Sequence, residues 1–229
     1  MYNESSIIKD TAQTLSEYMS ANFDDYEIIF SDDGSLDGCG DLVREMELPC
    51  VRVVRCEQNM GKGYAVRTAM LAAEGDYMMF TDADLAYGTD VIKNVYETFL
   101  SNPDADVVIG SRNINEDGYA GYTAIRKIAS KMYIGVLCIL GGFKLSDSQC
   151  GCKAFTSRAV KNIFPRCEVN RFAFDFEAIL WASKYGMKIV EMPVKIINHR
   201  ESSVHIIRDS LRMVKDLVKM RKRIKKANI

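Results

Sequence analysis

Short apolar segments alternate with helical segments through the first half of the chain, and this alternation constrains the fold more than any other feature. The apolar segments, such as YMMF (77–80) and VVI (107–109), are continuous hydrophobic runs. Continuous runs are typical of strands that are covered on both faces, as in parallel sheets. The alternation therefore predicts an α/β fold with a mostly parallel central sheet flanked by helices.

The same pattern gives expected bounds for the elements. We expect strands at about 26–35, 50–56, 76–86, 105–113 and 187–197. We expect helices at about 6–21, 36–47, 61–75, 89–101, 122–141, 172–186 and 204–229. After Arg112 the regular alternation stops, and only short strand and loop pieces are expected around 147–157. A chain of 229 residues can bury one large core, so we predict one domain over 1–229.

Composition indicates an ordinary globular domain, with 48% hydrophobic and 27% charged residues. The seven cysteines are irregularly spaced and no secretory apolar segment opens the sequence, so we interpret them as reduced thiols of a cytoplasmic protein. Cys150 and Cys152 lack a second ligand pair of the kind that zinc sites use, and we expect them to be buried. The net charge is −1, and we expect no nucleic-acid partner.

The charge is unevenly distributed along the chain. Residues 208–229 contain nine Lys and Arg against two Asp, a balance of +7, so residues 1–207 carry −8 of the total of −1. An apolar stripe runs along the expected last helix and consists of Ile207, Leu211, Val214 and Val218. Such a helix either lies on an anionic membrane surface or packs on the core with a solvated basic end. The most apolar run, at 133–142, has about half the length that a transmembrane helix needs.

Polar residues follow three of the predicted strands where each strand ends. They are Asp32-Asp33-Gly34-Ser35, Asp82-Ala83-Asp84 and Gly110-Ser111-Arg112. Ligands of parallel α/β sheets bind beyond the carboxyl ends of the strands. Each group alone would be an ordinary turn or a solvated surface, but their common position at strand ends predicts a binding site.

A glycine-flanked lysine, Lys62 in the sequence NMGKG (59–63), opens a predicted helix between two of these strands. Glycine loops and helix N-termini favour phosphate groups, and the lysine adds a cation, although the spacing is not that of a Walker motif. Carboxylates alone would repel a phosphate, whereas Asp82 and Asp84 with Mg²⁺ or Mn²⁺ would bind one. The pattern therefore predicts a metal-dependent site for a nucleotide diphosphate.

These motifs resemble those of the family-2 glycosyltransferases of the GT-A fold. The resemblance is strongest to the branch with dolichyl-phosphate glucosyltransferase and dolichol-phosphate mannose synthase. The resemblance covers nearly the whole chain and rests on YNES (2–5), SDDGSLDG (31–38), NMGKGYAVRTAM (59–70), GDYMMFTDADLA (75–86), IGSRN (109–113), DSQCGCKAF (147–155), RFAFDFEAILWASKYGMKIVEMPV (171–194) and DLVKMRKR (216–223). The last three of these motifs are similar to those of the glucosyl branch, although Cys152 in DSQCGCKAF replaces the Phe of that branch. The Gln that the mannosyl branch carries two residues after the second Asp is absent.

The resemblance implies roles for individual residues on the donor side. It assigns 1–112 to nucleotide-sugar binding, 113–200 to acceptor binding and 201–229 to a basic amphipathic helix. The implied nucleotide-pocket residues are Tyr2, Asn3, Glu4, Asp33 and Lys62, with Asp33 near the base. Asp82, followed by Ala83, would contact the nucleotide sugar, Asp84 and Asp82 would bind the metal, and Gln149 would lie near the sugar.

On the acceptor side, Arg112, Arg126 and Ser130 match the residues that bind the acceptor phosphate, although the last two would equally suit a solvated helix face. Asp175 and Glu177 lie in the helix where related enzymes place a catalytic carboxylate. A phosphate monoester has a second pKa of ~6 and is largely dianionic at neutral pH, so it needs no strong base. We therefore expect Asp175 to orient and polarise groups in the site and not to be the essential base.

The expected activity is inverting transfer of a hexose, with glucose and UDP favoured, to a polyprenyl or dolichyl phosphate. The enzyme would lie in the cytoplasm, either free or peripherally bound to the cytoplasmic face of the membrane, and its oligomeric state stays open. One alternative is a family-2 enzyme with a hydroxyl acceptor, for which Asp175 would be an indispensable base. Others are a sugar-nucleotide synthesising nucleotidyltransferase, whose usual glycine- and arginine-rich N-terminal loop is absent from the sequence, and an inactive binding subunit.

Members of the resembled family have an apolar strand that runs directly into a Pro-x-Tyr-Asn-Glu motif. Here Met1 occupies the x position before Tyr2. Loss of that strand would leave neighbouring strand edges unpaired and open one wall of the pocket. We therefore expect that the natural start lies upstream and that Met1 is an internal methionine; the alternative is a short chain with reduced or absent activity.

Overall fold

A computed structural model describes residues 1–115, 118, 124–198 and 206–228, without the side chains of 124–131, 133 and 206–212. In chain order the elements are α1 (Ile8–Asn22), β1 (Ile28–Asp32), α2 (Cys39–Arg44), β2 (Val51–Arg55), α3 (Lys62–Ala72), β3 (Tyr77–Phe80), α4 (Asp90–Ser101), β4 (Val107–Ser111), α5 (Ala124–Gly141), β5 (Lys153–Thr156), α6 (Ser157–Ile163), η1 (Phe164–Arg166), α7 (Phe174–Lys184), β6 (Ile189–Pro193) and α8 (Ile206–Lys226). The alternation of strands and helices predicted from the sequence is present.

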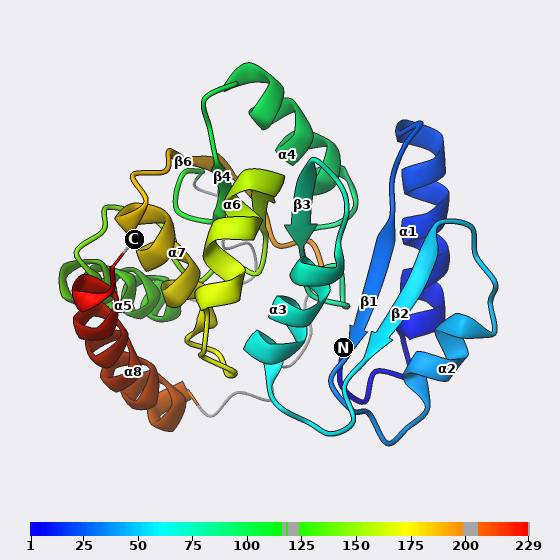
Figure 1. Ribbon diagram of the computed structural model, residues 1–229, viewed down its shortest axis with the longest axis horizontal. Coiled ribbons are helices and arrows are strands. Elements are labelled where there is room, and N and C mark those ends of the chain that lie inside the picture. Colours follow the sequence, from blue (N-terminus) through cyan, green and yellow to red (C-terminus); the bar gives the residue numbers. More distant parts are fainter. Residues whose placement is uncertain (116–117, 119–123, 199–205, 229) are drawn as a thin grey trace.

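The strands of the described residues form two sheets with helices around them (Figure 1). In the smaller sheet, β1 pairs parallel with β2. The larger sheet has the order β3-β5-β4-β6, in which β4 and β6 are parallel and β5 is antiparallel to both of its neighbours. All five residues of β4 are buried, as its continuous apolar run predicted for a strand covered on both faces.

Met1 pairs with the edge of β1 that faces away from β2. The Met1 nitrogen donates a hydrogen bond to the Ser31 carbonyl at 2.6 Å, and the Asp33 nitrogen donates to the Met1 carbonyl at 3.0 Å. These two bonds have the pattern of a parallel strand pair. Within the described ranges β1 and β3 belong to different sheets, and Met1 pairs with the edge of β1 that lies toward the larger sheet (Figure 1).

Buried side chains form a core on both sides of the larger sheet and a separate one behind β1. One group joins the larger sheet to the helices that follow it and includes Phe155, Phe176 and Leu217, each at most 1% exposed. Another lies between α4 and the sheet. The third, around Ile8 and Phe30, fixes α1 and α2 against β1. These groups hold the carboxyl ends of β1 and β3 in place.

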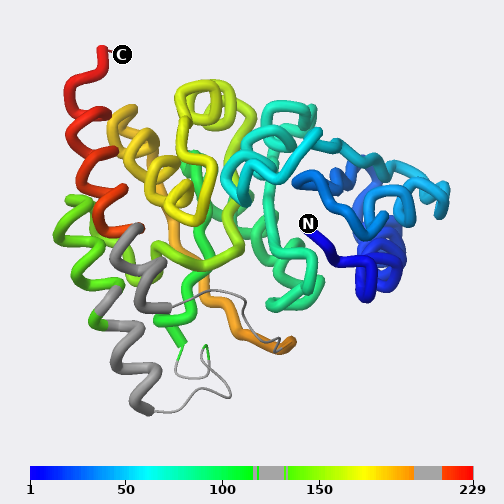
Figure 2. Tube along the Cα trace, turned by 90° about the horizontal axis from the view of Figure 1, so that it is seen from below, coloured from blue at the N-terminus to red at the C-terminus, as the bar shows by residue number. Residues whose placement is uncertain are grey.

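The last helix, α8, packs on the core through its apolar side. Leu217, Met220 and Ile224 are buried, and α8 contacts both α5 and α7 (Figure 2). Arg221 Nη1 donates to the Leu140 carbonyl at the end of α5 at 2.9 Å. Of the two interpretations of the basic helix, the structure therefore has the docked one. None of the helices in the described ranges has the length and hydrophobicity that crossing a membrane requires.

Candidate active site

The loop after β3 carries the carboxylates of Asp82 and Asp84. β3 ends two residues before Asp82, so the acidic pair lies on a turn rather than on the strand. Asp84 Oδ1 accepts a hydrogen bond from the Ala86 nitrogen at 3.1 Å, and Leu85 between them has a φ of +48°. The left-handed residue and the side-chain bond together define the shape of the loop.

Two segments distant in sequence hold this acidic loop from the outside. Thr11 Oγ1 on α1 donates to the Ala83 carbonyl at 2.8 Å. Asn198 Nδ2, in the chain that follows β6, donates to the Leu85 carbonyl at 2.9 Å. The loop is therefore fixed between the first helix and the segment after the last strand, which restricts where its carboxylates can point.

Lys62 at the start of α3 reaches the acidic loop. Its Nζ lies 2.5 Å from Asp82 Oδ1. Asp33, just past β1, accepts hydrogen bonds from the Met60 nitrogen on Oδ1 at 2.9 Å and from the Gly61 nitrogen on Oδ2 at 2.8 Å. Gly61 has a φ of +106°, a conformation that favours glycine. The end of β1 thus holds the glycine loop, and the loop places Lys62 against Asp82.

A buried ion pair that the sequence analysis missed lies beneath these residues. Lys153, the first residue of β5, is 0% exposed, and its Nζ is 2.6 Å from Asp175 Oδ1 and 2.6 Å from the Cys150 carbonyl. Asp175 lies in the first turn of α7, where the helix dipole favours a carboxylate. A lysine within an apolar strand is a signal for such a pair, because a buried ammonium requires a partner.

Charges of opposite sign alternate through the site. Burial raises the pKa of Asp175, although Lys153 and then Lys62 act in the opposite direction. Burial alone would lower the pKa of Lys62, but Asp82 and then Asp175 raise it above its ordinary value. Lys62 is therefore a cation at neutral pH. Lys62 compensates the acidic loop, and Lys153 compensates Asp175.

The acidic loop suits a divalent cation that is shared with a ligand. Within the described ranges, no group of three or more His, Cys, Asp or Glu side chains is arranged to hold an ion. The Asp82 side chain is 38% exposed, and a Cβ on Gly151 would collide with its Oδ2, so glycine at this position gives the carboxylate its room. Two carboxylates leave most of the coordination sphere of Mg²⁺ or Mn²⁺ to phosphate oxygens and water. The donor set fits such an ion.

The first residues of the chain lie against the loop after β1. The Asn3 nitrogen donates to Ser35 Oγ at 3.0 Å, and Asn3 Oδ1 accepts from the Leu36 nitrogen at 3.0 Å. Tyr2 is 43% exposed, and the Glu4 carbonyl accepts the nitrogens that open α1. The structure thus brings Asn3 to the same loop as Asp33, and leaves the Tyr2 ring open to solvent.

Arg112 lies at the end of β4 in a buried ion pair. Its Nε is 2.6 Å from Asp147 Oδ2 and its Nη2 is 3.0 Å from Asp147 Oδ1, and the Asp147 side chain is 0% exposed. The loop that carries Asp147 continues to Gly151, whose nitrogen donates to the Tyr87 hydroxyl at 3.3 Å. Gly151 also touches Asp82, so the loops of Arg112 and Asp82 meet at this glycine.

The remaining predicted residues are less closely placed. Arg126 and Ser130 belong to α5, but their side chains are outside the described set. Gln149 follows Asp147 on the same loop, and its Nε2 faces the Met213 sulfur at 3.9 Å. Glu177 is 0% exposed and accepts the nitrogens of Glu168 and Val169. Its contacts with these nitrogens and with Arg223 indicate a structural role in holding the loop before α7.

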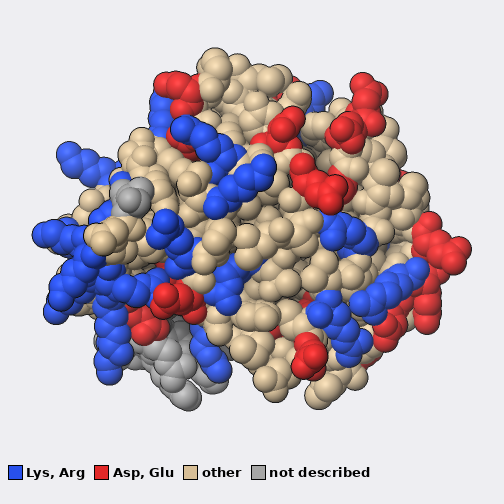
Figure 3. Space-filling model, in the orientation of Figure 1, with Lys and Arg blue, Asp and Glu red and all other residues tan. Residues whose placement is uncertain are grey.

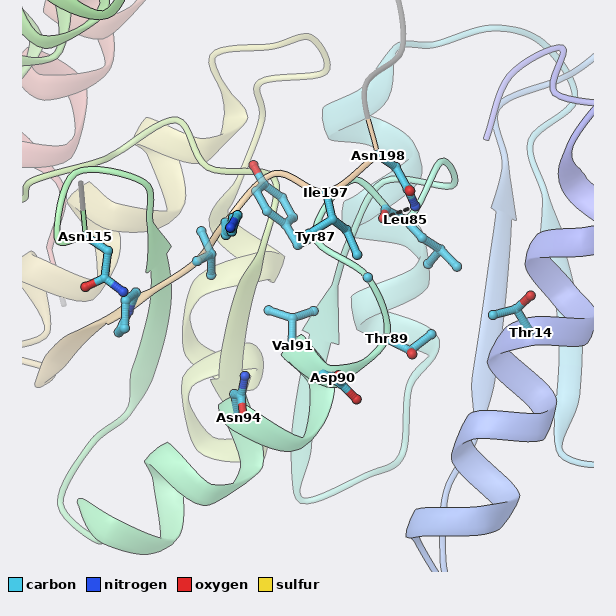
Figure 4. Close-up of a pocket in the computed structure, with 14 residues that line it drawn as sticks. Thr14, Leu85, Tyr87, Thr89, Asp90, Val91, Asn94, Asn115, Ile197 and Asn198 are labelled. Atoms are coloured by element: carbon cyan, nitrogen blue, oxygen red, sulfur yellow. Dashed lines mark hydrogen bonds between the residues drawn. The ribbon is translucent and has the colours of Figure 1, made fainter. Parts of the chain in front are cut away.

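A cleft of about 570 Å³ borders the chain that follows the acidic loop, from Leu85 onward (Figure 4). It is lined by Thr14 of α1, by the loop from Leu85 to Thr89 with the first turns of α4, and by the chain after β6 up to Asn198. Asp33, Lys62, Asp82 and Asp84 are not among its lining residues. The candidate nucleotide site is therefore the surface at the strand ends, and this cleft is a neighbouring feature.

Comparison with known proteins identifies relatives across nearly the whole chain. The sequence model of glycosyl transferase family 2 matches residues 1–164. The dolichyl-phosphate beta-glucosyltransferase of Dictyostelium discoideum is 31% identical over 96% of this chain and 71% of its own length. The UDP-N-acetylglucosamine–dolichyl-phosphate N-acetylglucosaminyltransferase of Methanococcus voltae is 29% identical over 86% of this chain and 82% of its own length.

Solved structures confirm the predicted fold. Glucosyl-3-phosphoglycerate synthase of Mycobacterium tuberculosis, solved with Mn²⁺, UDP-glucose and glycerol 3-phosphate, superposes with a TM-score of 0.70 at 17% identity, over 96% of this chain and 77% of that one. At this identity the likeness concerns the fold alone. The α/β architecture that the strand–helix alternation predicted is therefore the GT-A fold.

Proposed function

Because the chain belongs to glycosyl transferase family 2, we propose that it transfers a hexosyl group, with glucose favoured, from a UDP-sugar to a polyprenyl phosphate such as dolichyl phosphate. The observation that carries the proposal is the contact of Lys62 with Asp82 at 2.5 Å beside Asp84. It combines a cation at a helix start with two carboxylates at a strand end. The relatives named for dolichyl-phosphate transfer support the acceptor, and the Methanococcus relative is named for a UDP-sugar.

The donor would bind across the ends of β1 and β3. The cation of Lys62 suits the anionic diphosphate, and Asp82 and Asp84 would hold Mg²⁺ or Mn²⁺. The ion, when bound, would neutralise charge on the departing nucleoside diphosphate. Lys62 forms part of the same arrangement, because its ion pair with Asp82 orients that carboxylate.

The acceptor phosphate would be held by cations rather than activated by a base. Arg112 at the end of β4 is held in a fixed orientation by Asp147, which accepts hydrogen bonds from its Nε and Nη2. A planar guanidinium fixed in this way is suited to a second anion. Direct attack by the phosphate oxygen on the anomeric carbon, opposite the departing diphosphate, would invert the configuration at that carbon.

An assay with defined substrates tests this function. Purified protein with UDP-glucose, Mn²⁺ and a short polyprenyl phosphate in detergent is expected to form a polyprenyl-phosphate glucoside, and GDP-mannose in place of UDP-glucose is expected to give little product. Product analysis would check the inverted configuration. Transfer to a polyprenol, which lacks the phosphate, at the same rate would contradict the proposed acceptor.

The second candidate is transfer to a hydroxyl acceptor, which the closeness of Asp175 to Lys62 and Asp82 would support. The double variant Lys153→Met with Asp175→Asn removes both charges of the buried pair. We expect it to transfer to a phosphate acceptor at a rate within about tenfold of the Lys153→Met single variant, because a dianionic acceptor needs no general base. Steady-state rates with a polyprenyl phosphate measure this. A loss as complete as that of Asp84→Asn would favour the hydroxyl acceptor instead.

A further inference from the structure

The second half of α5 is apolar around its whole circumference. From Met132 to Phe143 the sequence contains no charged residue. One side of this segment is core, since Ile134 is 4% and Leu137 is 0% exposed. A helix that is hydrophobic all round is normally buried on all sides, so the opposite side of α5 requires an explanation.

That opposite side is exposed. Met132 is 69%, Val136 48% and Ile139 77% exposed. These residues are spaced i, i+4 and i+7, so they lie on one face of the helix, and we call them the outer stripe. Three large apolar side chains that share one face are more than the isolated exposed residues of an ordinary surface. The outer stripe is therefore a candidate contact surface.

The surroundings of the outer stripe are basic. Helix α8 packs beside α5, and Lys215, Lys219 and Lys222 on it are exposed. Lys144 directly follows the apolar segment and is also exposed. Lys and Arg side chains gather over α8 on the left of Figure 3. The partner of this surface must then be apolar at its centre and anionic around it.

We propose that the outer stripe of α5, rather than the apolar side of α8, inserts into the interface of an anionic phospholipid membrane, with the lysines of α8 on the lipid headgroups. This inference deepens the proposed function, which requires access to a lipid-borne phosphate. A shallow apolar insertion beside basic side chains is the usual physical basis of peripheral membrane binding. The apolar side of α8 is occupied by the core, which leaves α8 only its basic side for this surface.

Two further features favour a membrane over a second copy of the chain. A symmetric pair through the outer stripe would bring the basic side chains of both copies together, which is unfavourable. The apolar surface also continues beside the stripe, in a groove of about 300 Å³ lined by Ile134, Gly135, Cys138 and Leu145 with two polar residues. A fluid lipid surface can follow such a contour, whereas a protein partner would need a matching shape.

Vesicle sedimentation tests the inference. The full chain is expected to bind vesicles of phosphatidylcholine with phosphatidylglycerol, and Met132→Gln with Ile139→Gln is expected to weaken that binding by about tenfold or more. The matched control is Leu71→Gln with Leu100→Gln, which changes apolar residues of 50% and 57% exposure on other helices and is expected to bind like wild type. Replacing phosphatidylglycerol with phosphatidylcholine should weaken the binding of all three proteins.

The outcomes separate this inference from the proposed function. Unchanged vesicle binding of the α5 variant, or a wild-type dimer in light scattering that the same variant dissociates, would overturn the inference. UDP binding with Mn²⁺, followed by thermal shift, is expected to be equal in all three proteins and confirms that the variants are folded. Vesicle binding that depends on the outer stripe, together with failed transfer to polyprenyl phosphate, would leave the inference standing and refute the function.

Discussion

Asp84→Asn is expected to reduce hexosyl transfer by about 10²–10³-fold, the range seen when one charge-stabilising group is removed from an active site. The substitution keeps the shape of the side chain and its bond to the Ala86 nitrogen, so the loop after β3 should persist. What it removes is the negative oxygen that we propose as a ligand of the divalent ion. The loss should appear in the rate at saturating donor, because neutralisation of the departing diphosphate matters most in the transition state.

The matched control for this variant lies at the other end of the same strand. Asp76 precedes β3 and is exposed, so Asp76→Asn changes the net charge equally without touching the site, and it is expected to retain wild-type transfer. Rates for both variants should be measured with Mn²⁺ held in excess. Equal activity of Asp84→Asn and Asp76→Asn would show that the carboxylate at 84 has no part in the reaction.

Lys153→Met is expected to lower the free energy of unfolding by about 3–5 kcal/mol, the usual effect of removing one partner from a buried ion pair. Methionine has a similar length but leaves Asp175 Oδ1 and the Cys150 carbonyl without the ammonium that both contact at 2.6 Å. Against a total stability of about 5–15 kcal/mol for a typical domain, this is a large fraction. Urea unfolding at neutral pH measures the difference.

The pH dependence of this variant distinguishes a charge effect from a packing effect. Burial already raises the pKa of Asp175, and loss of Lys153 should raise it further. A carboxyl group whose pKa is raised in the folded state stabilises the fold at pH values below its unfolded-state pKa of about 3.9. This stabilisation is lost as the pH rises through the folded-state pKa. The deficit of Lys153→Met should therefore shrink toward pH 4. It should also shrink at neutral pH when Asp175→Asn is added. A deficit that is constant with pH and unchanged in the double variant would indicate lost packing.

Much of the site could be predicted because its residues lie at strand ends in sequence order. The end of β1, the start of α3 and the loop after β3 converge, and Asp33, Lys62 and Asp82 are placed by backbone position alone. The predicted strand at 76–86 was too long, since β3 stops at Phe80 and the acidic residues are on a turn. Continuous apolar runs cannot show where a turn begins when small and polar residues follow directly.

Other features required the tertiary structure. Lys153 stands in a segment expected to contain only short pieces, and its partner Asp175 is on a different element. The antiparallel position of β5 between β3 and β4 could not be predicted from a four-residue strand. The stripe predicted on α8 included Val214 and Val218, which are only partly buried, whereas the buried side chains are Leu217, Met220 and Ile224. Periodicity also cannot tell whether a core or a membrane covers an apolar face. The exposure of α5 likewise follows only from packing.

We propose that Lys62, Asp82 and Asp84 together hold a nucleoside diphosphate and a divalent ion, and UDP binding followed by thermal shift measures this. With UDP at 100 times its dissociation constant, wild type with Mn²⁺ is expected to gain about 2.7 kcal/mol of stability. Chelation by EDTA, or Asp84→Asn in the presence of Mn²⁺, is expected to abolish most of that gain. An equal gain under all three conditions would contradict the claim, because UDP would then bind without the acidic loop.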